Sequence, residues 1–137
     1  MTKDEILALS GDDLDALVAE KVMGIDKEEL FHAPLLNHWC GYVRRRDLEG
    51  DTALAQCYRS EPLGKWEYCG TEYSRDRRAL LTILDRMISL GWEPLLQHDD
   101  DGWLVAFGKG NGDGLPLVSM NLLEAVCKCA LLAVMGV

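Results

Sequence analysis

The chain has little positive charge. Its 14 lysines and arginines stand against 23 aspartates and glutamates, which gives a formal net charge of −9. Because phosphate backbones bind basic surfaces, we do not expect this chain to bind nucleic acid directly. An acidic surface is compatible with three roles: solubility, steering toward a basic partner, or imitation of nucleic acid on a nucleic-acid-binding protein.

Long apolar runs are also missing. None approaches the roughly 20 residues that span a bilayer, and the first residues, MTKDE, contain no apolar core of a signal peptide. We therefore expect a cytoplasmic protein that makes no membrane contact. The five cysteines are odd in number and are expected to remain thiols in a reducing compartment.

Motifs for nucleophilic or phosphate chemistry are absent as well. There is no G-x-S-x-G, and the alternating glycines between Gly108 and Gly114 lack the Lys-Ser/Thr and the following helix that a phosphate cradle needs. We therefore expect a protein that is not an enzyme and that needs no cofactor.

A metal site is the enzymatic alternative. Its candidate ligands concentrate in the middle of the chain and are His32, His38, Cys40, Cys57 and Cys69. Zinc sites usually show pairs such as C-x-x-C or H-x-x-x-H, and neither is present. Packed cysteines with surface histidines are the favoured interpretation, so no metal is predicted.

What is present is a globular composition, with 48% hydrophobic residues over 137 positions, which predicts a single domain over residues 1–137. Apolar residues at i, i+3, i+4 and i+8 from Leu14 predict a helix that ends at Gly24, with Ser10 as its cap. Thr2 is a cap signal for a shorter turn around Ile6. Residues 25–70 are poorly patterned: a short helix is expected around 35–45, and residues 53–58 fit either a strand or a helix.

The second half has a clearer pattern. Ser74 is expected to cap a helix with one apolar stripe, ended by Gly91; the stripe is Leu80, Leu81, Leu84, Met87 and Ile88. Strands are predicted at 92–97, 103–107 and 115–118, and a last helix from Asn121. Short loops between successive strands imply an α+β fold, an antiparallel meander of three or four strands layered with helices. Trp103, Val105 and Phe107 should share one buried face.

Four segments together resemble the phage αβα-sandwich domain family of small phage and prophage proteins. They are residues 14–24, residues 72–74 at a helix start, residues 101–103 on a hairpin, and residues 125–134. The resemblance implies phage origin and an αβα sandwich. It carries over no catalytic residue, because members of the family are mostly of unassigned function. Residues 25–70 depart from the short linker of the family and are a divergent insertion.

Aromatic and arginine side chains suggest where a partner would bind. They are the residue types enriched in binding hot spots, and the insertion supplies a candidate set: Trp39, Tyr42, Arg44, Arg45, Arg46, Tyr58 and Trp66. Arg77 and Arg78 are candidate ligand-binding residues, because the macrodipole disfavours cations in the first turn of a helix. The alternative for both sets is an ordinary core or a solvated helix end.

The leading hypothesis is a non-enzymatic phage or prophage accessory protein that binds a host protein, with inhibition of a bacterial defence system such as CRISPR as its sharpest form. The alternative is a protein that binds or sequesters an anionic nucleotide. Its arginines would hold the phosphates, and Trp39 or Trp66 would stack on the base. Homo-oligomerisation stays open under both hypotheses.

Overall fold

The computed structural model describes the backbone of residues 1–32, 39–46, 52–60, 66–109 and 116–137, and the side chains of residues 1–25, 68–109 and 116–137. Within these ranges the chain forms helices, an antiparallel four-stranded sheet and an antiparallel three-stranded sheet. The α+β class and the predicted meander are thereby confirmed.

The N-terminal segment is helical, as predicted. α1 (Lys3–Leu7) begins at Thr2, whose Oγ1 accepts a hydrogen bond from the Glu5 backbone N–H at 3.2 Å. α2 (Gly11–Leu17) runs directly into a π-helical turn, η1 (Val18–Val22). Ser10 is the N-cap residue of α2, as predicted, but its side chain makes no capping hydrogen bond, so the prediction that it forms a capping box is wrong.

The middle segment forms the four-stranded sheet. Its strands are β1 (Ile25–His32), β2 (Trp39–Arg46), β3 (Thr52–Ser60) and β4 (Trp66–Tyr68), paired in that order. The helix expected around 35–45 is wrong, since residues 39–46 are a strand. A short apolar run does not distinguish the two states, and here pairing with both β1 and β3 selects the strand.

The next helix starts later than expected. A 3₁₀ turn, η2 (Arg77–Ala79), leads into α3 (Leu80–Ser89). The cap is Asp76, which accepts from the Arg78 N–H at 3.0 Å, so the prediction that Ser74 caps this helix is wrong. Gly91 ends the helix as predicted, in the left-handed region at φ 93° that glycine adopts without strain.

The apolar stripe of α3 is rotated from its predicted position. Ile83 and Met87 are fully buried and Leu80 and Leu84 are partly buried, whereas Leu81 and Ile88 are exposed. Ile88, a member of the predicted stripe that we expect to face the core, is thus exposed, and that expectation is wrong. At 100° per residue the apolar residues of α3 form one arc of about 160°. Packing against α4 and η1 buries the edge of this arc that carries Ile83 and Met87, and leaves the edge with Leu81 and Ile88 exposed.

The second sheet is the predicted meander. β5 (Glu93–Asp99), β6 (Gly102–Gly108) and β7 (Leu117–Ser119) pair antiparallel in sequence order. Trp103, Val105 and Phe107 alternate along β6 and all join the core, which confirms their shared face. α4 (Leu122–Met135) follows, capped by Asn121 as predicted.

α4 is the centre of the core. It contacts η1, α3, β6, β7 and both N-terminal helices, and Val126, Cys127, Ala130 and Leu131 are fully buried. Its one charged pair is Glu124–Lys128, with 2.5 Å between Oε1 and Nζ. The Lys128 ammonium also donates to the Leu7 carbonyl at 2.7 Å, so that the end of α1 is bound to α4.

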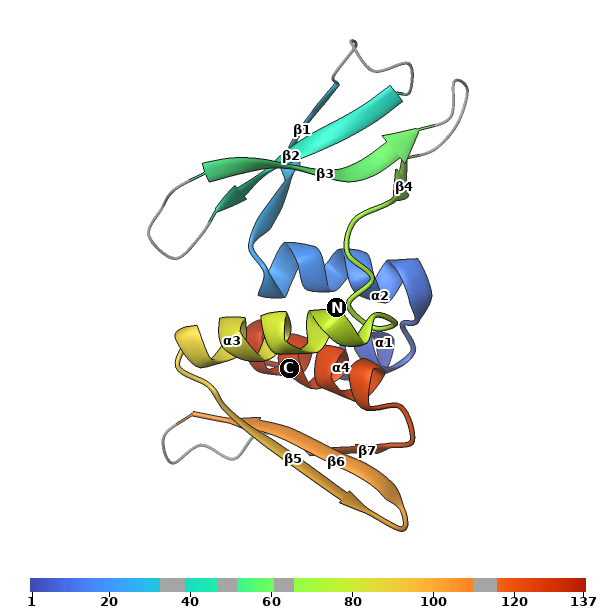
Figure 1. Cartoon of the computed structure of the whole chain (residues 1–137), viewed down its shortest axis with the longest axis vertical. Coiled ribbons are helices and arrows are strands. Elements are labelled where there is room, and N and C mark those ends of the chain that lie inside the picture. The colour runs from blue at the N-terminus through green and yellow to red at the C-terminus, as the bar shows by residue number, and fades with distance from the viewer. Residues whose placement is uncertain (33–38, 47–51, 61–65, 110–115) are drawn as a thin grey trace.

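Figure 1 shows the helices as a layer between the two sheets. The strongest contacts of the β1–β4 sheet with this layer run from β1 to η1 and from β4 to α2. The helices cover one face of the β5–β7 sheet only. The layer order is thus sheet, helices, sheet rather than αβα, because the middle segment builds a sheet of its own.

Candidate functional site

Three of the four aromatic residues predicted to bind a partner gather at one end of the β1–β4 sheet. Trp39 on β2 and Trp66 on β4 both pair with Ser60 on β3. Tyr58 pairs with Tyr68 and lies two positions from Ser60 on β3. Since side chains alternate along a strand, Trp39, Trp66 and Tyr58 occupy positions on the same face of the sheet.

The arginines of that set lie toward the opposite end of β2. Arg44 pairs with Asp26 and Leu54, and Arg46 pairs with Thr52. At ~3.3 Å per residue, Arg46 lies about 23 Å along the strand from Trp39. Tyr42 lies between them, directly after the shift in the β2–β3 pairing register that occurs between Gly41 and Tyr42. The backbone thus brings Trp39, Tyr58 and Trp66 together, but it does not bring the arginines close to them. The side chains of both groups lie outside the described residues.

The candidate zinc ligands fall mostly outside the described side chains, namely His32, His38, Cys40 and Cys57. Cys69 is described and exposed. Among the side chains that the structure describes, no three histidine, cysteine, aspartate or glutamate residues form a group that would hold a metal ion.

The two remaining cysteines are buried in α4. The Cys129 thiol donates to the Val105 carbonyl at 3.2 Å, and burial raises its pKa to about 11. Burial also raises the pKa of Cys127, and the negative charges of Asp15 and Glu124 raise it further. Both thiols stay protonated near neutral pH, so neither is a nucleophile.

The two arginines predicted to bind a ligand have different surroundings. Arg78 donates to both carboxylate oxygens of Asp76, at 3.1 Å from Nε and 3.0 Å from Nη2. This contact lowers the pKa of Asp76. The Arg77 carbonyl accepts a hydrogen bond from the Leu80 N–H. The Arg77 guanidinium makes no hydrogen bond or ion pair with the described part of the chain and is available to a ligand.

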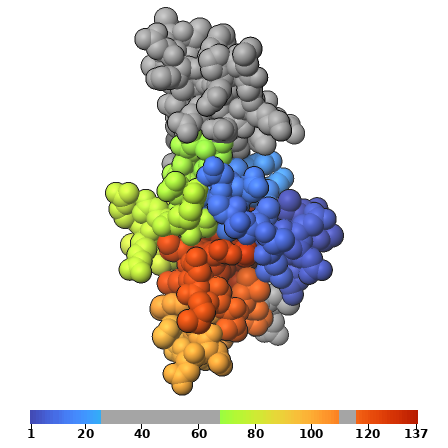
Figure 2. All heavy atoms as spheres, turned by 90° about the vertical axis from the view of Figure 1, so that its right-hand side faces the viewer, coloured from blue at the N-terminus to red at the C-terminus, as the bar shows by residue number. Residues whose placement is uncertain are grey.

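Arg77 borders a hollow between the starts of α3 and α4. The hollow has a volume of about 530 Å³, and its lining residues are Arg77, Leu80, Trp103, Met120, Asn121, Leu122 and Leu123. In Figure 2 the start of α3 (yellow-green), the start of α4 (orange-red) and the β5–β6 hairpin (orange) lie on one face. Arg77 is the one charged residue of the lining.

Met120 is positioned beside the hollow by a glycine. Its side chain is 80% exposed, and a Cβ on Gly102 would lie 3.1 Å from the Met120 sulfur and 2.7 Å from the Ser119 carbonyl oxygen. Gly102 also has φ 117°, which other residues rarely adopt. The hairpin glycine therefore lets the segment before α4 approach β6 closely.

A second surface, which we name the outer face, is the side of the β5–β7 sheet turned away from the helices. Leu104 pairs with Val118, and Leu95 pairs with Ala106 two residues farther along β6, so all four lie on this face. Val118 is 61% exposed and Leu95 46% exposed, whereas Leu104 is half-buried and Ala106 is buried. No helix of the described chain covers them.

Acidic residues border the outer face at both ends of β5. Glu93 begins the strand, and Asp99 to Asp101 form its end and the turn into β6. Within this turn the Asp101 N–H donates to Asp99 Oδ1 at 2.8 Å. The surface is thus an apolar row with an acidic rim, and Gln97, the β5 partner of Leu104, lies on the same face.

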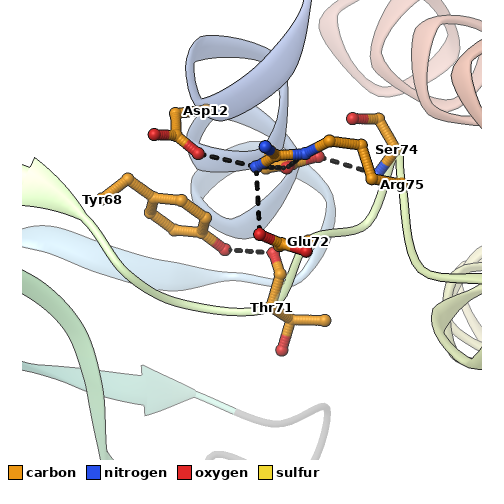
Figure 3. A network of polar contacts seen from close by, with 7 residues as sticks. Asp12, Tyr68, Thr71, Glu72, Ser74 and Arg75 are labelled. Carbon is orange, nitrogen blue, oxygen red and sulfur yellow. Dashed lines mark hydrogen bonds and ion pairs between the residues drawn. The ribbon is translucent and has the colours of Figure 1, made fainter.

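A polar network of described residues lies elsewhere, at the junction of α2 with the segment after β4 (Figure 3). The fully buried Asp15 accepts from the Ser74 N–H at 2.7 Å and from Arg75 Nη2 at 2.8 Å. Arg75 also contacts Asp12 at 2.6 Å and Glu72 at 3.6 Å, and the Asp15 and Asp12 carboxylates raise its pKa. These groups satisfy one another, so the network holds the fold rather than a ligand.

Sequence reasoning missed the outer face and the Asp15 network. The sequence does contain a signal for the outer face. Residues 104–107 are apolar at every position, and such a run predicts a strand with apolar side chains on both faces. The Asp15 network has no local signal, since Asp15 and Ser74 are 59 positions apart.

A scan of the chain against protein-family models finds no match, and neither does a comparison with curated proteins or with solved structures. The resemblance to the phage αβα-sandwich family stays a prediction. Among the described helices, none is both long enough and apolar enough to cross a membrane.

Proposed function

We propose that this chain is a non-enzymatic binding protein that docks on a partner protein through the outer face of the β5–β7 sheet. The apolar row of Leu95, Leu104 and Val118 carries the proposal, since Leu95 and Val118 are exposed and Leu104 is half-buried. Uncovered apolar surface on a folded domain is costly in water, and covering it is a main source of binding free energy.

The acidic rim sets the chemistry of the partner. Glu93 and the turn at Asp99 to Asp101 favour an apolar patch bordered by lysine or arginine. A second copy of this chain would bring the same acidic rims together, so like-charge repulsion disfavours self-docking. The net charge of −9 adds long-range attraction to a basic partner.

The nature of the partner is the second part of the proposal. Proteins that bind nucleic acid present basic surfaces, and a protein of phage origin, which the resemblance implies, would meet the proteins of its host. We propose a host protein of this kind, with a nucleic-acid-binding effector of a bacterial defence system as the sharpest form. The aromatic end of the β1–β4 sheet, with Trp39, Tyr58 and Trp66, is a further contact region in this proposal.

A capture experiment with matched variants tests the proposal. Val118→Lys places a charge on the outer face, and Leu81→Lys places the same charge on α3, where Leu81 is 69% exposed. The wild type and Leu81→Lys should capture the same protein from a bacterial lysate, and Val118→Lys should lose it. Capture that is equal for all three proteins contradicts docking at the outer face.

Two further measurements test the rest of the proposal. Capture should weaken as salt is raised from about 0.05 to 0.5 M, because salt screens the attraction between an acidic rim and a basic partner. The purified chain should be monomeric by light scattering; a dimer that Val118→Lys dissociates would instead assign the outer face to self-association.

A further inference from the structure

We infer that the hollow between the starts of α3 and α4 is a binding site for a small aromatic anion, a flat ring that carries a phosphate or a carboxylate. This site is separate from the docking function proposed for the outer face. The inference depends on three observations: the size of the hollow, the charge in its lining, and its apolar residues.

The size fits a small organic molecule. Sites for such ligands have volumes of about 300–1,000 Å³ and are mostly apolar with a few polar groups. At about 530 Å³ the hollow falls in this range. Its lining joins four aliphatic side chains to one indole, one amide and one guanidinium.

Arg77 determines the sign of the ligand. It is the one charged residue of the lining, and it has no anionic partner in the described part of the chain, whereas its neighbour Arg78 is paired with Asp76 at 3.0 Å. A guanidinium presents a planar fork of donors that matches the oxygens of a phosphate or a carboxylate. The ligand is therefore an anion, although the whole chain is acidic.

Trp103 and Met120 determine the body of the ligand. The Trp103 ring contacts His98 at a centroid distance of 4.8 Å, so the indole is held within the sheet while it lines the hollow. A flat ring gains from contact with an indole and with a thioether, and the flexible Met120 side chain adapts to its shape. A bare anion would use none of this surface.

The test is a titration followed through the Trp103 indole N–H resonance, assigned with Trp103→Phe. The probes are adenosine monophosphate, phenylacetate, adenosine and inorganic phosphate. Adenosine monophosphate and phenylacetate separate a nucleotide from an aromatic acid as the source of the ring. At least one of them should shift the resonance and saturate with a Kd below about 1 mM, and adenosine and inorganic phosphate should bind at least tenfold more weakly.

Arg77→Ala and Arg78→Ala form the matched pair, since the two residues are adjacent and both exposed. Arg77→Ala should weaken binding at least tenfold, and Arg78→Ala should leave it within about twofold. Three results overturn the inference: no shift with any probe at about 10 mM, equal losses in the two variants, or inorganic phosphate that binds as tightly as the ring-bearing anions.

Discussion

Asp15 and Arg75 are 60 positions apart in the chain and form an ion pair at the edge of the core. Arg75 donates to Asp15 Oδ2 from Nε at 3.2 Å and from Nη2 at 2.8 Å, while the Ser74 N–H donates to Oδ1. Asp15 is fully buried and the Arg75 side chain is 43% exposed. The pair fixes the chain after β4 against α2, and so sets where the β1–β4 sheet rejoins the helices.

Asp15→Ala should lower the free energy of unfolding by about 2–4 kcal/mol, because it leaves the buried Ser74 N–H without its acceptor and Arg75 without its main partner. The control is Asp12→Ala, which removes another carboxylate from Arg75. Asp12 is 62% exposed, so this change should cost at most about 1 kcal/mol. Urea unfolding measures both, and equal losses would contradict the assignment.

Ser74 supplies a prediction of opposite sign. Its backbone N–H binds Asp15, but its buried hydroxyl has no hydrogen-bond partner among the described residues. Ser74→Ala keeps the backbone contact and should raise the free energy of unfolding by about 1 kcal/mol. The comparison is Ser89→Ala, which removes an exposed hydrogen bond to the Arg86 carbonyl and should be close to neutral. A clear loss of stability in Ser74→Ala would show that the hydroxyl is engaged.

The orientation of α3 is tested by two alanine substitutions. Ile83 is fully buried, so Ile83→Ala should lower the free energy of unfolding by about 2–5 kcal/mol through lost burial and a cavity. Leu81→Ala, on the exposed side, should change it by less than about 0.5 kcal/mol. Thermal and urea unfolding measure both losses of stability. A larger loss for Leu81→Ala than for Ile83→Ala would show that the side of α3 with Leu81, not the side with Ile83, faces the core.

Asp76 gives a pH-dependent prediction. Arg78 lowers the Asp76 pKa below its ordinary value of about 3.9. The stabilisation by this pair is therefore present at neutral pH and is lost as the pH falls through the lowered pKa of the folded state. Arg78→Ala should raise the midpoint of the Asp76 carboxyl titration followed by NMR, whereas Arg77→Ala should not. An unchanged midpoint in Arg78→Ala would contradict the pair.

Elements with local signals were predictable from the sequence. Thr2 and Asn121 cap helices through hydrogen bonds to residues three positions away, and Gly91 ends α3 through its own φ angle. The meander follows in the same way from a turn at Asp99 to Gly102 and from short alternating strands.

Elements that depend on tertiary contacts were not predictable. Residues 39–46 form a strand because β1 and β3 pair with them, and the buried side of α3 is chosen by the helices that pack on it. Arg77 and Arg78 lie in the turn before α3, and their different surroundings follow from the contact of Arg78 with Asp76, which sequence patterns do not show.

Docking at the outer face of the β5–β7 sheet is tested most directly by the affinity of the captured partner for three purified proteins: the wild type, Val118→Lys and Leu81→Lys. Val118→Lys should weaken binding at least tenfold, because a lysine at this position removes apolar contact from the row that it shares with Leu95 and Leu104. Leu81→Lys should bind within about twofold of the wild type. If Val118→Lys binds as tightly as the wild type, the outer face is not the docking surface.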